Sequence, residues 1–340
     1  MQFNQLSTIK VSVIIPVYNA EDYILNSLNS ILQQTHKSLE IWVIDDASTD
    51  KTIENIQSLS DDRIKLIKKT KNSGYTDSLN YGLEVATGKY IARMDADDIS
   101  YPERIAKQVA YMESQPDCVV CGSWITLVPG GKLLTYPVTH EDIVAQLLRV
   151  NAMCHPSVMI RKSVIDQHEL RYNREYEPAE DYDMWSRMAF LGKLHNIPEP
   201  LLQYRLHDNQ ISTTKYEIQR AHMRAVRLKL LQLHHPTSNS EVYNTMPILT
   251  GMSVTNWLKN KYAALDELNK LQGKLPVAVI QNFVQYQKKE VIRNITRREN
   301  KYTLKVWMSI LVRCPEAFIN LGLKHTITFL IRSLHFVIFK

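Results

Sequence analysis

The sequence predicts an α/β protein with a mostly parallel sheet flanked by helices, followed by a helical C-terminal region. Over the first 95 residues, short apolar runs alternate with stretches in which apolar side chains recur at helical spacing. Two acidic clusters directly follow apolar runs, and from about residue 214 long amphipathic helical patterns dominate. An alternation of strands and helices is typical of a parallel sheet with right-handed crossover connections.

Each expected element rests on its own pattern. Residues 11–16 form an apolar run that ends at a proline, as expected of a buried parallel strand. Residues 75–86 have helical spacing and are followed by Gly88, and the strand at 90–94 runs into Asp95. The full expected order is strand 11–16, helix 20–34, strand 39–44, helix 49–59, strand 64–67, helix 75–86, strand 90–94, helix 102–112 and strand 118–127.

Length and composition suit one large domain with an appended segment. The chain has 340 residues, of which 44% are hydrophobic and 22% charged, and these are ordinary globular values. We expect a sheet-containing domain over residues 1–213, a helical region over 214–300, and a basic, apolar tail over 301–340.

The basic charge of the chain is concentrated in that tail. The formal net charge is +6, and residues 301–340 hold six basic side chains and one acidic side chain. The rest of the chain is nearly neutral, which argues against a nucleic-acid partner. Apolar residues interspersed with Lys and Arg fit a helix lying on an anionic membrane surface. Packing of the tail on protein is the alternative.

The N-terminus and the cysteine content bear on the compartment. Residues 1–10 are polar and lack the apolar segment of a signal peptide. No run of about 18 uninterrupted apolar residues occurs, which argues against a membrane-spanning helix. Four cysteines are too few for a disulfide framework and fit a reducing compartment. We therefore expect a cytoplasmic protein, peripheral on the cytoplasmic face of the inner membrane if the tail binds lipid.

Three carboxylates within four residues follow the strand at 90–94. Asp95, Asp97 and Asp98 repel one another unless a cation or hydrogen-bond donors neutralise them. Oxygen ligands of this kind suit Mg²⁺ or Mn²⁺, which can stabilise charge on a diphosphate leaving group. A solvated turn that caps the next helix is the alternative. Because ligands of parallel sheets bind beyond the carboxyl ends of the strands, the position of the cluster favours a functional site.

Several motifs together resemble one family. Residues 11–19 (VSVIIPVYN) closely resemble the opening strand of family 2 glycosyltransferases with the GT-A fold. Residues 44–50 (IDDASTD) resemble the second signature of that family. The stretches 72–80 and 86–91, followed by the acidic cluster at 95–98, complete the pattern.

This resemblance is specific over roughly residues 9–110 and looser to about residue 213. It implies that the sheet-containing domain has the Rossmann-like GT-A fold. It also implies that this domain binds a nucleotide-sugar and carries out catalysis.

The resemblance implies a nucleotide site at the ends of the first strands. Pro16 and Tyr18 would line the base pocket beside Asn19, with Tyr18 packing on the base. Asp46 would accept a hydrogen bond from the base imide, which favours uracil or thymine. Gly74 would let the backbone approach the nucleotide. The alternatives are a core aromatic at position 18 and a helix cap at position 46.

The same resemblance assigns the metal and phosphate contacts. Asp97 would be the direct metal ligand, and Asp95 would contact the ion, its water shell or the ribose. Residues 204–212 resemble the segment that ends the catalytic domain in this family. There His207 would be a late metal ligand or a phosphate contact, and Arg205 would hold phosphate oxygens.

On the acceptor side, residues 180–185 resemble the general-base motif of the family. Asp181 would deprotonate the acceptor hydroxyl, and Glu180 would orient the acceptor. A single base implies one in-line displacement with inversion, unlike the paired carboxylates of retaining glycoside hydrolysis. His155 lies in a segment that resembles one close to the sugar or acceptor. Helix capping by Asp181 and a structural role for His155 are the alternatives.

Together these features predict a metal-dependent, inverting hexosyl- or N-acetylhexosaminyltransferase. It would move a sugar from a UDP-sugar to a saccharide acceptor, lipid-linked in some relatives, during synthesis of O-antigen, capsule or another surface glycan. A nucleotidyltransferase is the alternative enzyme, but residues 16–19 lack the Gly-rich, basic loop usual there. A non-catalytic nucleotide-binding protein is the third hypothesis, and Asp95, Asp97 and Asp181 argue against it.

Overall fold

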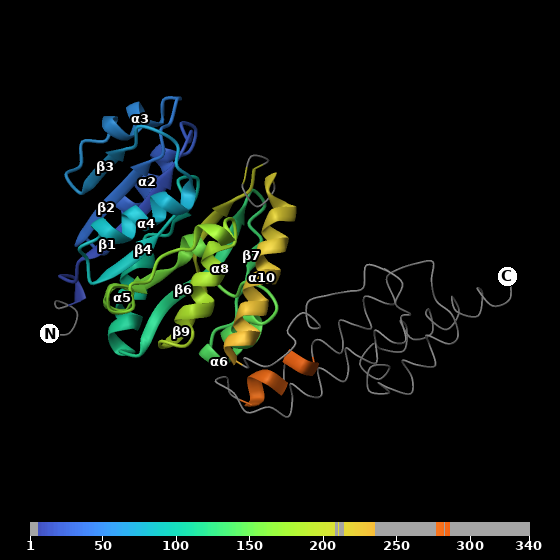
Figure 1. The fold of residues 1–340 in the computed structure, drawn as a ribbon. Helices are drawn as coiled ribbons and strands as arrows, with labels where there is room; N and C mark the ends of the chain where they lie inside the picture. Colours follow the sequence, from blue (N-terminus) through green and yellow to red (C-terminus); the bar gives the residue numbers. More distant parts are fainter. Residues whose placement is uncertain (1–5, 208–209, 211–213, 235–276, 282, 286–340) are drawn as a thin grey trace, which may run out of the picture. The chain divides into compact units, whose positions relative to one another are not determined.

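The computed structural model describes residues 6–207, 210, 214–234, 277–281 and 283–285 (Figure 1). The chain divides into two compact units, Met1–Val226 and Arg227–Lys340. The sheet and all the candidate site residues belong to the first unit. The tail at 301–340 and most of the helical region at 214–300 lie outside the described residues. The expected domain boundaries and the role of the tail therefore stay predictions.

The first half of the sheet is parallel. Its strand order is β3-β2-β1-β4, and all three of these pairings are parallel. The strands alternate with helices along the chain, as predicted. The elements are β1 (Val11–Val17), α2 (Ile24–Leu32), β2 (Leu39–Asp45), α3 (Thr52–Ser58), β3 (Ile64–Lys68), α4 (Tyr75–Val85) and β4 (Tyr90–Arg93).

Beyond β4 the sheet is mixed. The order continues β8-β6-β9-β5, with β7 paired to β6, and of these pairings only that of β6 with β9 is parallel among the described strands. The sheet thus has fewer parallel pairings than the sequence predicts, because the short strands β8 and β5 pair antiparallel with β4 and β9. The bounds are β5 (Ile99–Ser100), β6 (Cys118–Val128), β7 (Leu133–Leu134), β8 (Met159–Arg161) and β9 (Lys193–Arg205).

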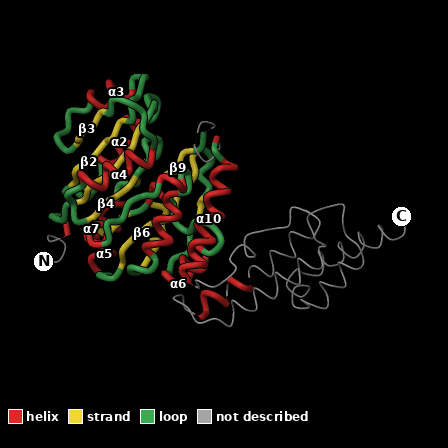
Figure 2. Tube along the Cα trace, viewed as in Figure 1, coloured by secondary structure: helices red, strands yellow, loops and turns green. Residues whose placement is uncertain are grey.

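Helices cover both faces of the parallel half, and Figure 2 shows helices alternating with the strands. β1 is buried along its whole length, which explains its mostly apolar sequence, and its one polar residue, Ser12, is hydrogen-bonded to Glu40. Val13 and Ile15 belong to the same core cluster as Leu28 of α2, whereas Ile14 points to the opposite face and meets α4 at Gly82. Residues 2 apart along a strand share a face, so this alternation is the expected one.

The remaining helices lie between or after the strands of the second half of the sheet along the chain. Among them α8 carries the expected general-base motif at its first turn, and its Trp185 side chain is fully buried. Burial of this helix fixes the direction in which its first residues point. The elements are α5 (Arg104–Ser114), α6 (His140–Leu147), η1 (His155–Ser157), α7 (Lys162–Gln167), η2 (Arg174–Tyr176), α8 (Glu180–Met188) and α10 (Tyr216–His234).

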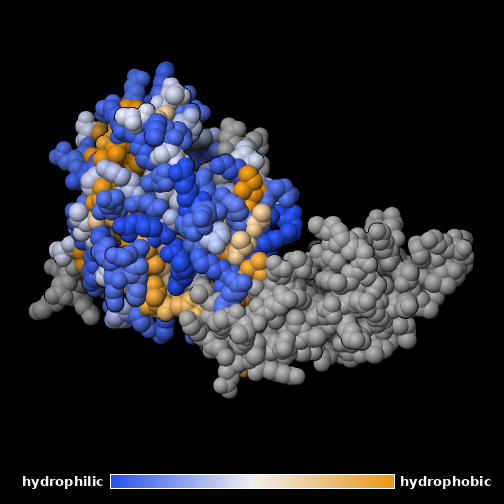
Figure 3. Space-filling view, in the orientation of Figure 1, coloured by the Kyte–Doolittle hydropathy of each residue, from blue (hydrophilic) through white to orange (hydrophobic). Residues whose placement is uncertain are grey.

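The surface is mostly hydrophilic on the face shown in Figure 3, with hydrophobic residues in small separate groups. Tyr18, Leu134 and Leu206 are among the large apolar side chains that are exposed. Within the described part of the chain, no helix combines the length and the apolar character that crossing a bilayer requires.

Gly88 lies where the chain approaches β1 before entering β4. A Cβ atom there would lie 2.6 Å from the Ser12 amide nitrogen and 2.8 Å from the Lys10 carbonyl oxygen. These are backbone atoms and cannot rotate away, so Gly88→Ala should lower the free energy of unfolding by roughly 1–3 kcal/mol. Chemical denaturation followed by circular dichroism measures this loss. The exposed Glu84→Ala is the control, and a Gly88→Ala protein as stable as wild type would contradict the close packing.

Candidate active site

A cavity of about 500 Å³ opens beyond the carboxyl end of β4. Its volume is in the usual range for small-molecule sites. Five residues predicted from the sequence line it together: Asp95, Asp97, His155, Glu180 and Asp181. Residues from distant parts of the chain complete its lining, including Tyr75, Arg93, Ile125, Leu127, Leu134, Tyr136, Asn151, Glu177, Tyr204, Leu206, Gln210 and Gln219.

The acidic cluster has the donor set of a hard-metal site. Carboxylate oxygens of Asp95, Asp97 and Asp98 lie within 4.8 Å of one another. Asp98 is fully buried and accepts a hydrogen bond from the Arg205 amide at 2.9 Å, whereas Asp95 and Asp97 face the cavity. Burial and the charge of Asp95 raise the pKa of Asp97, so a cation would relieve an electrostatic cost. Oxygen ligands alone fit Mg²⁺ or Mn²⁺, which Asp95 and Asp97 would hold.

Arg205 and His207 contact this cluster from the end of β9. Arg205 Nε donates to the Asp97 carbonyl oxygen at 2.8 Å, and His207 Nε2 lies 2.8 Å from Asp97 Oδ2. Both side chains also pack on Tyr23. The Arg205 guanidinium carbon lies 5.1 Å from the centroid of the Tyr23 ring, and the centroid of the stacked His207 ring lies 5.3 Å from it. They therefore fix the conformation of Asp97, and their direct contacts with metal and phosphate stay predictions.

Arg93, the last residue of β4, is a buried cation in the cavity lining that was not predicted from the sequence as a site residue. Its side chain is 3% exposed, and Nη2 donates to Asp95 Oδ1. The guanidinium lies 5.4 Å from the ring centroid of Tyr75. A charged residue inside an otherwise apolar strand is itself a signal, because ionised side chains are seldom buried without a partner.

Glu180 and Asp181 open α8 and differ in charge at neutral pH. Asp181 accepts hydrogen bonds from Asn151 Nδ2 at 2.6 Å and from the Tyr182 amide at 2.7 Å. Burial raises the pKa of Asp181 to about 6. Burial and the neighbouring Asp181 charge raise the pKa of Glu180 to about 8. At pH 7 Asp181 is therefore mostly ionised and Glu180 mostly protonated, which makes Asp181 the available base.

His155 is buried beside these carboxyl groups. Its Nε2 atom lies 3.1 Å from the Tyr172 hydroxyl, and its Nδ1 atom lies 4.0 Å from Glu180 Oε1. Burial and then the charge of Arg93 lower the pKa of His155 well below its ordinary value. A neutral imidazole results, which suits hydrogen bonding rather than charge pairing.

The residues predicted to bind the base gather at the ends of β1 and β2. Asn19 joins the two loops, since its amide donates to Ser48 Oγ and its side-chain oxygen accepts from the Thr49 amide, both at 2.9 Å. Tyr18 beside it is 51% exposed, and Pro16 is buried in β1. These residues lie at the carboxyl ends of parallel strands and are not among the described residues that line the 500 Å³ cavity.

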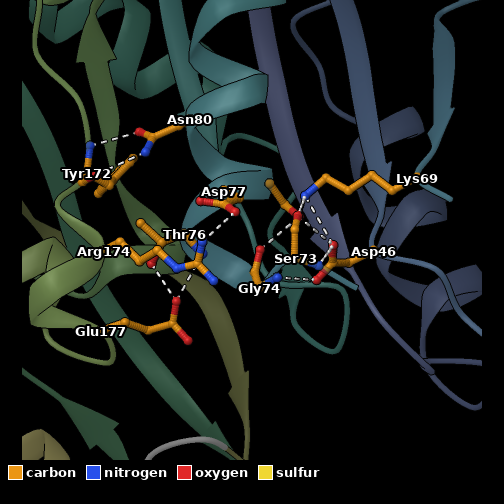
Figure 4. A network of polar contacts seen from close by, with 11 residues as sticks. Asp46, Lys69, Ser73, Gly74, Thr76, Asp77, Asn80, Tyr172, Arg174 and Glu177 are labelled. Atoms are coloured by element: carbon orange, nitrogen blue, oxygen red, sulfur yellow. Dashed lines mark hydrogen bonds and ion pairs between the residues drawn. The ribbon is translucent and has the colours of Figure 1, made fainter. Parts of the chain in front are cut away.

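Asp46 is held in a network of polar contacts (Figure 4). Its Oδ1 accepts from the Ser73 amide at 3.0 Å and from Lys69 Nζ at 3.1 Å, and its Oδ2 accepts from the Gly74 amide at 2.9 Å. Gly74 has φ +102°, a conformation that favours glycine. A carboxylate oxygen can accept a second hydrogen bond, so Asp46 Oδ2 keeps capacity for a base imide.

The same network links α4 to the segment before α8 (Figure 4). Asn80 makes two hydrogen bonds with the backbone of Tyr172, at 2.8 and 2.9 Å. The Thr76 hydroxyl donates to Glu177 at 2.8 Å, and Arg174 pairs with Asp77 at 3.1 Å. These contacts attach the segment that leads to Glu180 and Asp181 to α4 in the parallel half of the domain.

Comparisons with known proteins agree with this geometry. The family described as "Glycosyl transferase family 2" matches residues 12–168. An "Uncharacterized glycosyltransferase" of Haemophilus influenzae is 34% identical, over 85% of this chain and 97% of its own length. This chain belongs to glycosyl transferase family 2. It is therefore a glycosyltransferase, and the family decides against the nucleotidyltransferase alternative.

This family 2 glycosyltransferase is similar in sequence to further relatives and similar in fold to proteins of solved structure. "Amylovoran biosynthesis glycosyltransferase AmsE" of Erwinia amylovora is 31% identical, over 64% of this chain and 85% of its own. S. aureus TarS in complex with UDP-GlcNAc has a TM-score of 0.56 at 19% identity, covering 84% of this chain and 92% of that one. Mannosyltransferase PcManGT from Pyrobaculum calidifontis, in complex with GDP-Man and Mn²⁺, has a TM-score of 0.52 at 19% identity, covering 96% and 87%. The expected GT-A fold is confirmed.

The raised pKa of Glu180 predicts a pH-dependent stability. Between the ordinary pKa of 4.5 and the folded-state pKa of about 8, the folded protein keeps a proton that the unfolded chain has lost. Stability therefore falls as pH rises through this window. Glu180→Gln cannot ionise, so its melting temperature relative to wild type should increase steadily from about pH 5 to about pH 9.

Thermal denaturation at stepped pH measures this effect. Glu84→Gln, at an exposed position of α4, is the matched control and should follow the wild-type curve. A difference between Glu180→Gln and wild type that stays constant across the window would show that the Glu180 pKa is not raised.

Proposed function

We propose that this glycosyltransferase moves one sugar from a UDP-sugar to a hydroxyl of a saccharide acceptor, with inversion and with a divalent metal ion. One observation carries the proposal: the acidic pair Asp95 and Asp97 and the ionisable Asp181 line the same cavity. A single displacement needs a site for the leaving diphosphate and a base for the attacking hydroxyl around one sugar. This cavity supplies both kinds of group.

In the proposed reaction, the acceptor oxygen attacks the anomeric carbon as the bond from that carbon to the diphosphate oxygen breaks. Asp181 takes the proton of the acceptor hydroxyl, and the diphosphate leaves with the bonding electron pair. Asn151 orients the Asp181 carboxylate through its 2.6 Å hydrogen bond. A pKa of about 6 lets Asp181 act as a base near neutral pH. One displacement inverts the configuration at the anomeric carbon.

Asp97 and Asp95 would hold the Mg²⁺ or Mn²⁺ ion. When bound, such an ion supplies positive charge that stabilises the leaving diphosphate. His207, at 2.8 Å from Asp97, orients that carboxylate and is positioned to join as a ligand. The Mn²⁺ in the PcManGT complex supports a divalent ion for this fold.

Uridine is the base that we propose for the donor. Asp46 offers acceptor oxygens at the end of β2, and the uracil imide offers one N–H. Tyr18, half exposed beside it, would stack on the base. The UDP-GlcNAc bound by TarS supports this donor class, whereas the GDP-Man bound by PcManGT makes guanosine donors the comparison to test.

The acceptor is proposed to be a precursor of a surface glycan, as the name of the AmsE relative suggests. Leu134 and Leu206 line the cavity and are 37% and 45% exposed, which gives its rim an apolar character suited to a lipid-linked saccharide. The basic tail at 301–340, outside the described residues, would add contacts to the cytoplasmic face of the inner membrane.

A donor panel tests the proposed function. UDP-linked glucose, galactose, N-acetylglucosamine and N-acetylgalactosamine, with GDP-mannose for comparison, are assayed by release of the nucleotide diphosphate. We expect release from a UDP-sugar, lost in EDTA and restored by Mn²⁺ or Mg²⁺. Asp97→Asn should behave like wild type in EDTA, because a neutral amide is a poorer ligand for a hard cation. Release that is insensitive to EDTA, or only from GDP-mannose, contradicts the proposal.

Asp181→Asn separates binding from chemistry. This variant should bind UDP with Mn²⁺ as wild type does but lose at least about 100-fold in transfer rate, because the base is removed. The wild-type rate should rise with pH around a midpoint of about 6, as the Asp181 carboxyl ionises. Asp166→Asn, an exposed carboxylate of α7, is the control. Transfer by Asp181→Asn near the wild-type rate would rule out the general-base role.

A further inference from the structure

Arg93 is the one cation among the described residues that line the cavity. Only part of its guanidinium is engaged: Nη2 bonds Asp95, whereas Nε and Nη1 have no hydrogen-bond partner within the described part of the chain. The side chain is 3% exposed. Leaving donors of a buried charged group unpaired is costly, so a ligand that reached these two N–H groups from the cavity would relieve that cost.

Glu180, which lines the same cavity, has an unpaired carboxyl oxygen. Its side chain is 5% exposed, and Oε2 is without a hydrogen-bond partner among the residues described. His155 connects it to Arg93, because Nδ1 lies 4.0 Å from Glu180 Oε1 and the His155 ring meets Tyr75 edge-on at 6.3 Å. Tyr75 in turn packs against the Arg93 guanidinium. Arg93 and Glu180, each with unpaired polar atoms, therefore line the same cavity.

The reaction defines what occupies that space, and this step rests on the proposed function. The anomeric carbon must lie between the diphosphate, at Asp95 and Asp97, and the acceptor hydroxyl, at Asp181. Arg93 bonds Asp95, and its charge also acts on the Asp181 carboxyl group. Arg93 therefore borders the position of the transferred sugar ring.

We propose that Arg93 and Glu180 bind ring hydroxyls of the transferred sugar, and that this sugar is neutral. Arg93 donates through Nε and Nη1 to hydroxyl oxygens, and the Glu180 carboxyl group, which keeps its proton at neutral pH, makes the complementary hydrogen bond through Oε2. A hydroxyl group both donates and accepts, so it fits this pair. Even with Glu180 protonated, the cavity holds one guanidinium against the carboxyl groups of Asp95, Asp97, Glu177 and Asp181, which disfavours a uronate or another anionic sugar.

Arg93→Lys separates sugar binding from a purely structural role. Lysine keeps the positive charge beside Asp95 but lacks the Nε and Nη1 donors. With the preferred UDP-sugar, kcat/KM should fall about 10- to 100-fold, the effect expected for lost hydrogen bonds between a charged group and substrate hydroxyls. The Kd of UDP with Mn²⁺ should stay within about 3-fold of wild type, since UDP carries no transferred sugar.

Monodeoxy donors provide the decisive comparison. Removing the hydroxyl that Arg93 binds should reduce kcat/KM for wild type by a similar factor and cause little further loss for Arg93→Lys. Arg161→Lys is the matched control, because Arg161 lies on the neighbouring β8 and bonds the carbonyl oxygens of Cys118 and Met112 outside the cavity. Arg93→Gln, which keeps an uncharged donor, is the second variant if Arg93→Lys does not fold.

The outcomes distinguish this inference from the proposed function. Wild-type kinetics from Arg93→Lys, equal losses with every deoxy donor, or a preference of wild type for UDP-glucuronate would each overturn the inference while glycosyl transfer from UDP-sugars stands. A parallel loss of UDP affinity would assign Arg93 to the metal site alone and also overturn it. Absence of release from any UDP-sugar by wild type would overturn the proposed function, and this inference with it.

Discussion

The crowding of carboxyl groups around one cavity is the constraint on which this site depends. Besides burial, the charge of Asp95 raises the pKa values of Asp97 and Asp98, and the charge of Asp181 raises that of Glu180 on α8. The protein offsets this repulsion only in part, with one buried guanidinium and a few N–H donors. The remaining negative potential is what makes the site receptive to a divalent cation, because a cation relieves repulsion that folding has already imposed.

The mixed sheet makes this crowding achievable. In the parallel half, β4 delivers the acidic cluster at its carboxyl end, as such sheets deliver ligand-binding residues in general. The antiparallel β8 and the long β9 then bring the rest of the chain back beside it, so that Arg205 reaches Asp97 and Asp98 from more than 100 residues away. The first half of the sheet therefore supplies the acidic cluster after β4, and the second half supplies Arg205 and His207, which hold that cluster.

The sequence predicted the parallel half well, because mostly apolar runs such as 11–16 reflect burial on both faces of the sheet. The mixed half was harder to predict, since β5 and β8 span only two and three residues and leave no periodicity in the sequence. Asp95, Asp97, Asp181 and Glu180 were found through motifs, and the structure gathers them in one cavity. The contacts of Asn151 and Glu177 escaped prediction, because their partners Asp181 and Thr76 are distant in sequence and no local pattern encodes such pairs.

The bonds between α4 and the segment at 172–177 have a consequence for engineering. A chimeric glycosyltransferase could be designed by exchanging the donor-binding loops and the acceptor-binding loops between homologues as separate modules. Here Asn80 bonds the backbone of Tyr172, and Thr76 bonds Glu177. A chimera that replaces the parallel half alone would lose these bonds, which position the segment that leads into α8. A chimera that takes residues 74–80 and 172–177 from the same parent keeps these bonds. The two segments should therefore be transferred together, although they lie far apart in the sequence.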